Sequence, residues 1–330
     1  MIEINKLNAR IYSKLGQSGA TFGLGIFDVL DEDFDIVVLS SDMSRAAGLD
    51  RFKTQYPERF FNVGIAEQNM IGVASGLSSE GKNVIVTAQA AFLSMRSCEQ
   101  MRQYLGYMKS SVIAVGLGAG FALTYFGNTH YAIEDVSIMR SIPGMTILSP
   151  SDAGQAAKAL VAAVNLKKPV YIRLTSTMNC PIVYNEDYSF IIGKSIKVKD
   201  GKDITIFATG SMVYYSIKAA EIIENEGISV RVIDMHTIKP IDEEMVTNCL
   251  DSNMFVSIEE HSIIGGIGSA ISEYISDIKN SPTLLRLGVM DTFSHPGEYL
   301  YLLEQHRLQP QLISEDILKK YKKANFNANI

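Results

Sequence analysis

Short apolar runs rich in β-branched residues alternate along the chain with longer segments whose apolar residues recur every three or four positions. Within residues 67–79, Met70, Val73 and Leu77 fall on one stripe at helical spacing. The first half therefore predicts strands at 35–40, 83–88, 112–116, 145–149 and 170–174, and helices at 67–79, 96–107, 132–140 and 153–166. Strands that alternate with helices indicate βαβ units and a parallel sheet.

A polar, turn-rich stretch at residues 179–203 interrupts this alternation, and we interpret it as a connection. The alternation then restarts, with strands predicted at 204–208, 230–234 and 254–259 and helices at 214–226 and 267–278. We therefore expect an α/β protein with two three-layer α/β/α domains and mostly parallel sheet, at residues 1–187 and 188–330. The basic, polar tail from residue 319 is expected to fray.

Composition narrows the class of protein. Of the 330 residues, 47% are hydrophobic and 20% charged, which allows two substantial cores. The formal net charge of −6 argues against nucleic-acid binding, and no apolar run approaches the roughly 20 residues of a membrane-spanning helix. Three widely spaced cysteines, Cys98, Cys180 and Cys249, fit neither a disulfide framework nor a zinc site. With no visible signal peptide, we expect a cytoplasmic chain without membrane or nucleic-acid partners.

The stretch FFNVGIAEQNM, residues 60–70, carries the most informative carboxylate. Glu67 stands at a predicted loop-to-helix junction, where the helix N-terminus favours its negative form and burial favours its neutral form. Together these influences can tune a proton donor. A glutamate that merely opposes the helix dipole is the commoner arrangement.

The longer stretch FFNVGIAEQNMIGVASGL resembles the pyrimidine-domain signature of transketolases and 1-deoxyxylulose-5-phosphate synthases, which use thiamine diphosphate. The resemblance continues in order through residues 40–52, 90–102, 127–152, 169–174 and 233–242. It implies a thiamine-diphosphate pyrimidine-binding domain at 1–187 and a transketolase C-terminal-like domain at 188–330.

The resemblance assigns cofactor roles to four residues. Glu67 matches the carboxyl that hydrogen-bonds N1′ of the pyrimidine and favours the imino tautomer, which removes the thiazolium C2 proton. Phe92 matches the aromatic residue that packs on the pyrimidine. Asp42 matches an acid near the cofactor and the dimer contact, and Met43 matches the apolar residue that supports the bent cofactor. Without the resemblance, Phe92 could be an ordinary core residue, and Met43 could equally be core filler.

Two further residues match the substrate side of the family's site. His130 resembles the histidine that orients substrate hydroxyls and handles protons. Arg173, on a predicted strand, resembles an arginine that grips the substrate phosphate with its bidentate fork. A capping or core histidine and a surface salt bridge are the respective alternatives.

Several positions depart from transketolases that act on sugar phosphates. Phe22, Gly118 and Ala46 stand where phosphate-contacting Arg, His and Ser residues are usual. Phe126 replaces an Asp that reads a substrate hydroxyl, and Gln89 replaces a second aromatic residue beside the cofactor. We therefore expect weak phosphate recognition and a substrate that is larger, nucleotide-linked, unphosphorylated or otherwise modified.

The chain contains no Gly-Asp-Gly turn, which the family uses with a downstream Asn to bind the diphosphate and Mg²⁺. The resemblance thus implies the C-terminal subunit of a split transketolase, with no metal ligands of its own. A separate N-terminal subunit would hold most of the Mg²⁺ site, in an α2β2 assembly with a homodimeric contact through the pyrimidine domains. Together they would transfer a two-carbon ketol unit from a ketose to an aldehyde, on small-molecule sugars.

Two other functions stay open. The β subunit of a 2-oxo-acid or acetoin dehydrogenase first component has nearly the same length and domain order, although its glutamate lies in a different motif. A non-catalytic interaction subunit would retain the fold. Gln89 and Phe126 leave this second alternative open, whereas the Glu67–Phe92 pair opposes it.

A glycine-rich run, Gly265-Gly266-Ile267-Gly268, superficially resembles a nucleotide-binding loop. Its spacing departs from the dinucleotide fingerprint, so a tight strand-to-helix turn is the favoured interpretation. We expect His261 and His295 to serve loops or interfaces rather than to bind ligands.

Overall fold

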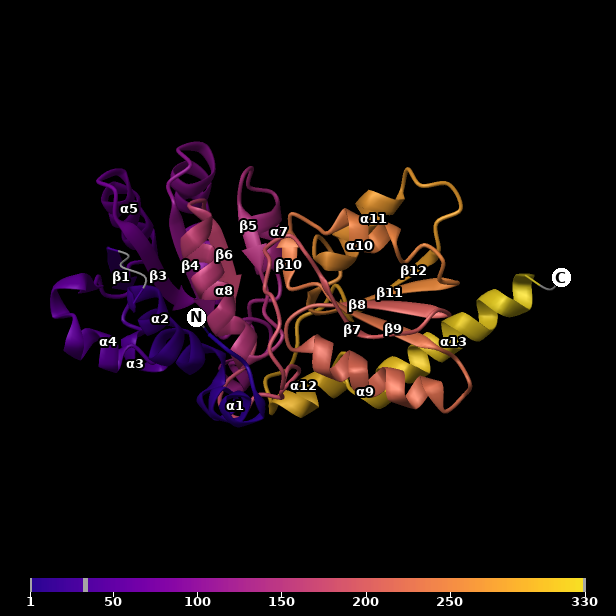
Figure 1. Ribbon diagram of the computed structural model, residues 1–330. Coiled ribbons are helices and arrows are strands. Elements are labelled where there is room, and N and C mark those ends of the chain that lie inside the picture. The colour runs from indigo at the N-terminus through magenta and orange to yellow at the C-terminus, as the bar shows by residue number, and fades with distance from the viewer. Residues whose placement is uncertain (1, 32–34, 329–330) are drawn as a thin grey trace.

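The computed structural model describes residues 2–31 and 35–328, whose strands form two mostly parallel sheets with flanking helices (Figure 1). This arrangement confirms the expected α/β class. None of the described helices is long and apolar enough to cross a membrane.

The first sheet orders its described strands β10-β5-β6-β4-β3-β1-β2. Their bounds are β1 Ile36–Ser40, β2 Phe60–Asn62, β3 Asn83–Gln89, β4 Val112–Leu117, β5 Thr146–Leu148, β6 Val170–Arg173 and β10 Thr237–Lys239. All neighbours pair parallel except β10, which pairs antiparallel with β5 and places Thr237 opposite Leu148. The carboxyl ends of the parallel strands therefore share one edge, where ligands usually bind.

Helices surround this sheet, and two of them have the predicted bounds. The helical segments are α1 Lys6–Ala20, η1 Thr21–Gly25, α2 Ile26–Asp31, α3 Ser44–Ala47, α4 Asp50–Gln55, η2 Pro57–Arg59, α5 Glu67–Ser79, η3 Phe92–Arg96, α6 Cys98–Gln100, η4 Met101–Tyr107, η5 Thr124–Phe126, α7 Asp135–Arg140 and α8 Ala153–Leu166. Helices α5 and α8 match the prediction. The helix predicted at 96–107 begins earlier, at Phe92, and consists of consecutive π-helical and α-helical turns.

The second sheet orders its described strands β12-β11-β8-β9-β7, with β7 antiparallel to β9. The bounds are β7 Ile196–Lys199, β8 Ile204–Ala208, β9 Val230–Asp234, β11 Met254–Ser262 and β12 Thr283–Val289. The accompanying helices are α9 Met212–Glu224, α10 Glu243–Thr247, α11 Ile267–Ile275, α12 Tyr299–Gln305 and α13 Pro310–Ala328. Because α13 is helical to Ala328, the expectation that the tail frays is wrong for its described part.

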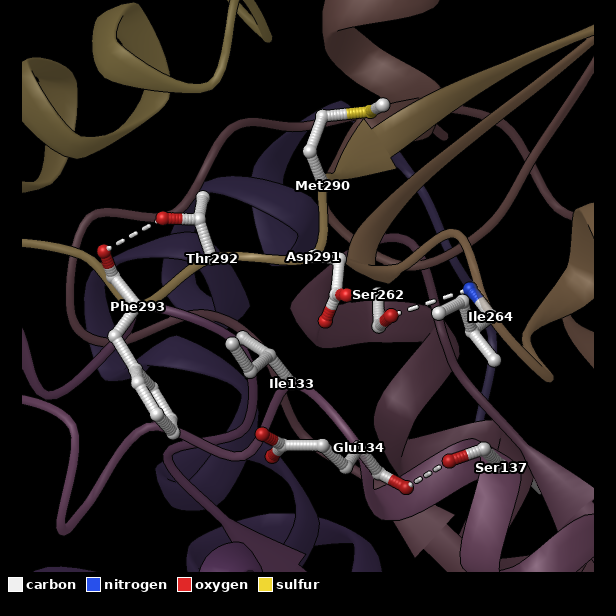
Figure 2. Close-up of a pocket in the computed structure, with 9 residues that line it drawn as sticks. All are labelled: Ile133, Glu134, Ser137, Ser262, Ile264, Met290, Asp291, Thr292 and Phe293. Atoms are coloured by element: carbon white, nitrogen blue, oxygen red, sulfur yellow. Dashed lines mark hydrogen bonds between the residues drawn. The ribbon is translucent and has the colours of Figure 1, made fainter.

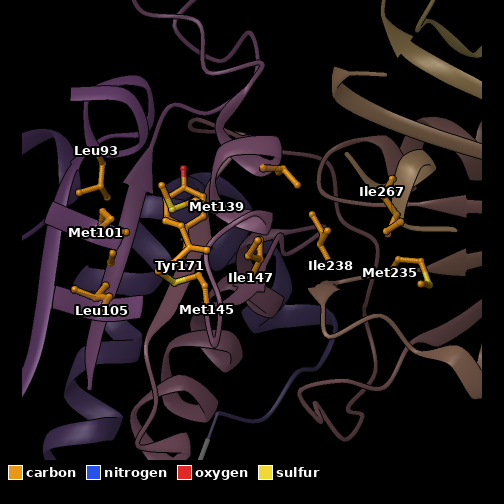
Figure 3. Close-up of a cluster of buried hydrophobic side chains, with 14 of the residues drawn as sticks. Leu93, Met101, Leu105, Met139, Met145, Ile147, Tyr171, Met235, Ile238 and Ile267 are labelled. Carbon is orange, nitrogen blue, oxygen red and sulfur yellow. The ribbon is translucent and has the colours of Figure 1, made fainter. Parts of the chain in front are cut away.

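Apolar side chains cover both faces of the first sheet, because successive residues of a strand point to opposite sides. Along β1, Val37 and Leu39 join one buried cluster, while Ile36 and Val38 join another. The first of these clusters extends to the second sheet: Figure 3 shows it running from Leu93 past Tyr171 to side chains such as Met235 and Ile267. The two sheets thus share a core, and the boundary near residue 187 stays a prediction.

The glycine-rich run forms a tight turn between β11 and α11. Gly265 has a φ of +79°, and a Cβ on Gly266 would lie 1.8 Å from Oε2 of Glu259. The Glu259 carboxylate accepts hydrogen bonds from the backbone N–H groups of Ile267 and Gly268, at 2.8 and 3.0 Å. The amides that open α11 are therefore occupied by the chain's own carboxylate, which confirms the turn interpretation.

Candidate active site

The residues expected to contact the cofactor gather at the carboxyl edge of the first sheet. Asp42 and Met43 follow β1, Glu67 opens α5 after β2, and Gln89 ends β3. Phe92 begins the π-helical segment that follows β3. Because β2, β1 and β3 are neighbours in the sheet, segments far apart in sequence converge here.

Glu67 is buried, with 2% of its side chain exposed, and pairs with Arg96. Arg96 Nη1 donates a hydrogen bond to Glu67 Oε2 at 2.8 Å. The same guanidinium lies over the ring of Phe92, with its central carbon 4.2 Å from the ring centroid. A carboxylate at the first residue of a helix also faces the positive end of the helix dipole. One arginine therefore contacts both the acid and the aromatic residue, fixing their relative positions.

Sequence reasoning missed Arg96. The signal was available, because Arg96 lies four residues after Phe92 inside the stretch 90–102 that resembles the family. Residues four apart on a helical segment face the same side, so a cation over the Phe92 ring was a foreseeable contact.

His130 also contacts Phe92. The Phe92 and His130 rings meet edge to face with centroids 5.1 Å apart, and the His130 and Phe126 centroids lie 5.0 Å apart. Thr129 Oγ1 lies 2.9 Å from His130 Nδ1 and orients the imidazole. A continuous series of contacts thus runs from Glu67 through Arg96, Phe92 and His130 to Phe126, and we call it the candidate-site contact series.

Asp42 and Met43 occupy the neighbouring loop after β1. Asp42 is exposed and adopts a left-handed backbone with φ of 56°. Asn62, at the end of β2, donates from Nδ2 to Asp42 Oδ1 at 3.0 Å and accepts the Asp42 N–H at 3.1 Å. Met43 packs against the apolar cluster that includes Phe22. Asn62, which sequence reasoning also missed, therefore fixes the loop that carries Asp42.

Gln89 presents an unsatisfied polar atom at the same edge. Its Oε1 is buried and has no hydrogen-bond partner among the described residues. Buried acceptors are ordinarily paired, so this oxygen is available to a donor on a ligand. A buried carboxylate, an aromatic face and an unpaired amide oxygen together suit a planar heterocycle with hydrogen-bonding nitrogen atoms, such as the pyrimidine of thiamine diphosphate.

Arg173 lies apart from this group and is almost fully buried, with 1% of its side chain exposed. Its Nε donates to both carboxylate oxygens of Asp135, at 3.0 and 2.9 Å. Its Nη2 donates to the backbone oxygens of Ala132 and Glu260, at 3.0 and 2.7 Å. This position argues against contact with a substrate phosphate and favours a structural role between the His130 segment and β11.

The positions that depart from sugar-phosphate transketolases are spread over different environments. Phe22 is fully buried in the apolar cluster that includes Ile36 and Val38, so it is not open to a ligand. A Cβ at Gly118, whose φ is +66°, would meet the side chain of Leu123 at 2.7 Å. Ala46 is exposed, and Phe126 has 62% of its surface exposed beside His130. Phe126 is therefore the departure that most directly shapes the candidate site.

No group of three or more His, Cys, Asp or Glu side chains within the described ranges is arranged to hold a metal ion. His261 is buried, and its Nδ1 lies 2.7 Å from the Ser262 carbonyl oxygen. Burial lowers the pKa of His261 to about 4.

Comparison with known proteins identifies the family of this chain. The family described as "Transketolase, pyrimidine binding domain" matches residues 18–180, and "Transketolase, C-terminal domain" matches residues 193–313. The chain is 38% identical over 291 residues to a putative transketolase C-terminal section of Methanocaldococcus jannaschii, covering 88% of this chain and 91% of that protein.

Two other comparisons extend the similarity. A 6-deoxy-6-sulfo-D-fructose transketolase subunit of a Clostridium species is 38% identical over 305 residues, covering 91% of this chain and 93% of the relative. A solved structure described as a split-gene transketolase, in the form of an inactive β4 tetramer, superposes with a TM-score of 0.83 at 37% identity. That superposition covers 92% of this chain and 98% of the solved one. This chain therefore belongs to the transketolase family, in which it corresponds to the C-terminal section of split transketolases.

Proposed function

We propose that this chain is the pyrimidine-side subunit of a two-component, thiamine-diphosphate-dependent transketolase. The enzyme transfers a two-carbon ketol unit from a ketose donor to an aldehyde acceptor. The candidate-site contact series is the main support for this proposal, because it brings an acid, an aromatic ring and a histidine to one edge of the sheet.

Thiamine diphosphate, when bound, supplies a carbon nucleophile at its thiazolium ring. Glu67 holds a proton in a hydrogen bond to N1′ of the pyrimidine, while Arg96 keeps Oε2 of the carboxylate engaged. Phe92 packs on the pyrimidine, and Gln89 Oε1 offers a buried acceptor toward the same ring. Asp42 and Met43 complete the cofactor side from the loop after β1.

His130 acts on the substrate side of the same edge. Thr129 orients its ring, so the imidazole can hold substrate hydroxyls and move protons between them and the reacting oxygen. The exposed face of Phe126 provides an apolar wall where an Asp would read a hydroxyl. One relative is a transketolase subunit for 6-deoxy-6-sulfo-D-fructose, which supports a modified ketose as donor rather than a simple sugar phosphate.

A separate N-terminal subunit completes the enzyme in this proposal. It binds the diphosphate and most of the Mg²⁺ coordination sphere, because the present sequence has no Gly-Asp-Gly turn. Two copies of each subunit assemble around contacts between pyrimidine domains. The description of a split-gene relative as an inactive β4 tetramer supports a subunit that does not act alone.

Reconstitution tests the proposal. The chain is purified with a candidate partner that carries Gly-Asp-Gly, and ketol transfer to an aldehyde is measured with simple and modified ketoses. We expect activity only with both chains and the cofactor. Glu67→Gln should lower kcat at least about 100-fold, since proton transfer by a positioned side chain contributes about 10²–10⁴. The exposed Glu99→Gln, nearby on α6, is the matched control and should leave the rate unchanged.

Three results would contradict parts of the proposal. Decarboxylation of pyruvate without ketol transfer would indicate a 2-oxo-acid dehydrogenase component. A pair whose rate is unaffected by Glu67→Gln would indicate a non-catalytic interaction subunit. Turnover of xylulose 5-phosphate with ribose 5-phosphate at ordinary transketolase efficiency would rule out the modified substrate.

A further inference from the structure

The segment 121–132 carries Phe126 and His130, and it is attached at both ends to β11 of the second sheet. At its start, the Phe121 N–H donates to Glu260 Oε1 at 2.6 Å. At its end, Arg173 bridges the backbone oxygens of Ala132 and Glu260 through Nη2. Both attachments involve buried groups, so the ends of the segment are fixed.

Between these ends, Asn128 makes a paired contact with the stretch that connects β12 to α12. Asn128 Nδ2 donates to the backbone oxygen of Ser294 at 2.8 Å, and the Ser294 N–H donates to Asn128 Oδ1 at 3.1 Å. Two hydrogen bonds between one side-chain amide and one residue's backbone restrict both distance and rotation. Asn128 is two residues from His130, so this contact acts close to the imidazole.

Ser294 is itself held in a fixed position. Its Oγ lies 2.5 Å from Nε2 of His306, and the His306 ring stacks on Phe121 with centroids 4.9 Å apart. Phe121 in turn meets Tyr131 edge to face at 5.2 Å. The Asn128 side chain is therefore hydrogen-bonded to a residue, Ser294, that His306 holds in place. His306 also packs on Phe121, which in turn contacts Tyr131 at the other end of the His130 segment.

An open cavity borders this contact. A cavity of about 320 Å³ separates Ile133, Glu134 and Ser137 from Met290 to Phe293, as Figure 2 shows. Phe293 is 76% exposed and Met290 is 57% exposed, so neither is packed into a core. Loss of the Asn128 hydrogen bonds would therefore not be compensated by close packing at this cavity.

We infer that Asn128 is a positioning residue through which the C-terminal domain holds His130 in place for catalysis. This inference rests on the proposed ketol transfer. A catalytic group displaced by about 1 Å can cost up to about 100-fold in rate, so a two-bond restraint near His130 has a measurable kinetic effect. The inference gives the second domain a direct part in the reaction without any contact to substrate.

Hydrogen exchange of the full chain tests the restraint itself. Amides of the segment 121–132 should exchange faster in Asn128→Ala than in wild type. Asn128→Asp keeps the size and the acceptor toward the Ser294 N–H but loses the donor and faces the Ser294 carbonyl oxygen with a carboxylate. It should increase exchange in the same direction. Asn225→Ala, an exposed asparagine at the end of α9, is the matched control and should leave this segment unchanged.

Kinetics of the reconstituted enzyme test the positioning role. Asn128→Ala should lower kcat/KM about tenfold, mostly through kcat, with thiamine diphosphate affinity unchanged. Rates measured well below the melting temperature of each variant separate this effect from a general loss of stability.

Unchanged exchange in both Asn128 variants would overturn the inference, as would faster exchange with unchanged kcat and KM. If the wild-type pair transfers no ketol unit, the proposed function and the catalytic role of Asn128 fail together. The exchange comparison then still decides separately whether Asn128 restrains the segment.

Discussion

Arg96 donates a hydrogen bond to the Glu67 carboxylate across 2.8 Å, although the two side chains stand in different surroundings. Glu67 is 2% exposed, whereas 43% of the Arg96 side chain is exposed. The arginine therefore lies between solvent and the buried acid. Its contact with the Phe92 ring means that any change at Arg96 affects the acid and the aromatic residue together.

Replacing Arg96 by Met should weaken thiamine diphosphate binding to the reconstituted enzyme about tenfold, or about 1.4 kcal/mol. Met preserves much of the side-chain length but leaves the buried carboxylate without its hydrogen bond. A cofactor titration followed by near-ultraviolet circular dichroism measures the effect. Arg102→Met, at an exposed arginine on η4, is the control. Tighter binding in Arg96→Met would instead mean that the guanidinium occupies the place of the pyrimidine.

Replacing Arg173 by Met should destabilise the chain by about 3–5 kcal/mol, because it leaves the Asp135 carboxylate buried without its partner. Urea unfolding of wild type, Arg173→Met and the exposed Arg45→Met measures the difference. A direct phosphate contact would produce the opposite pattern, with unchanged stability and a raised KM for phosphorylated substrates only.

Asp234 makes the stability of the chain depend on pH. Its Oδ2 accepts hydrogen bonds from Tyr184, Gln155 and Ser151 at 2.6, 2.8 and 3.1 Å, but burial raises the pKa of this carboxyl from 3.8 to about 7. A raised pKa in the folded state contributes stability that is complete below the unfolded value. That contribution is lost as pH rises through about 7.

Asp234→Asn should therefore gain stability relative to wild type as pH rises from about 4 to about 7. Asn keeps an oxygen for the three donors and does not titrate. Urea unfolding of both proteins at a series of pH values gives the difference in free energy, which cancels the titration of all other groups. A difference that does not vary with pH would refute the assignment.

Gly266→Ala should destabilise the chain by about 1–3 kcal/mol, since its Cβ would overlap the Glu259 carboxylate that binds the start of α11. Gly76→Ala is the paired control. That glycine is exposed within α5, where a Cβ meets nothing within 4 Å. It should instead gain about 0.5–1 kcal/mol from lower backbone entropy in the unfolded state. Thermal unfolding of the two variants should therefore shift in opposite directions.

The fold followed from the sequence wherever hydrophobic periodicity was strong. Helices α5 and α8 and strands β8 and β9 have the predicted bounds, because their buried apolar positions mark them clearly in the sequence. Strands β2, β7, β10 and β12 were not predicted. Strands β2 and β10 span three residues each, and β7 and β12 are only partly buried edge strands, so none shows a continuous buried apolar run.

The candidate site was only partly accessible to sequence reasoning. Glu67, Phe92 and His130 were identified through a family resemblance, and the structure brings them together. The contact of Arg96 with Phe92 was foreseeable from their spacing, whereas its hydrogen bond to Glu67 and the contact of Asn128 with Ser294 join distant segments and were missed. The environment of Arg173 could not be foreseen either. Whether an arginine at the end of a strand is open or enclosed depends on what packs over it, here Ala132 and Glu260.

Strand β10 makes the first sheet depend on the second half of the sequence. It comes from the second half of the sequence, yet it forms the outer strand of the first sheet against β5. A fragment that ends near residue 187 would leave the hydrogen-bonding groups of β5 uncovered, and such open edges promote aggregation. The pyrimidine domain is therefore a poor unit for separate expression. If the gene were divided between the two halves, the first product would need the second to stay monodisperse.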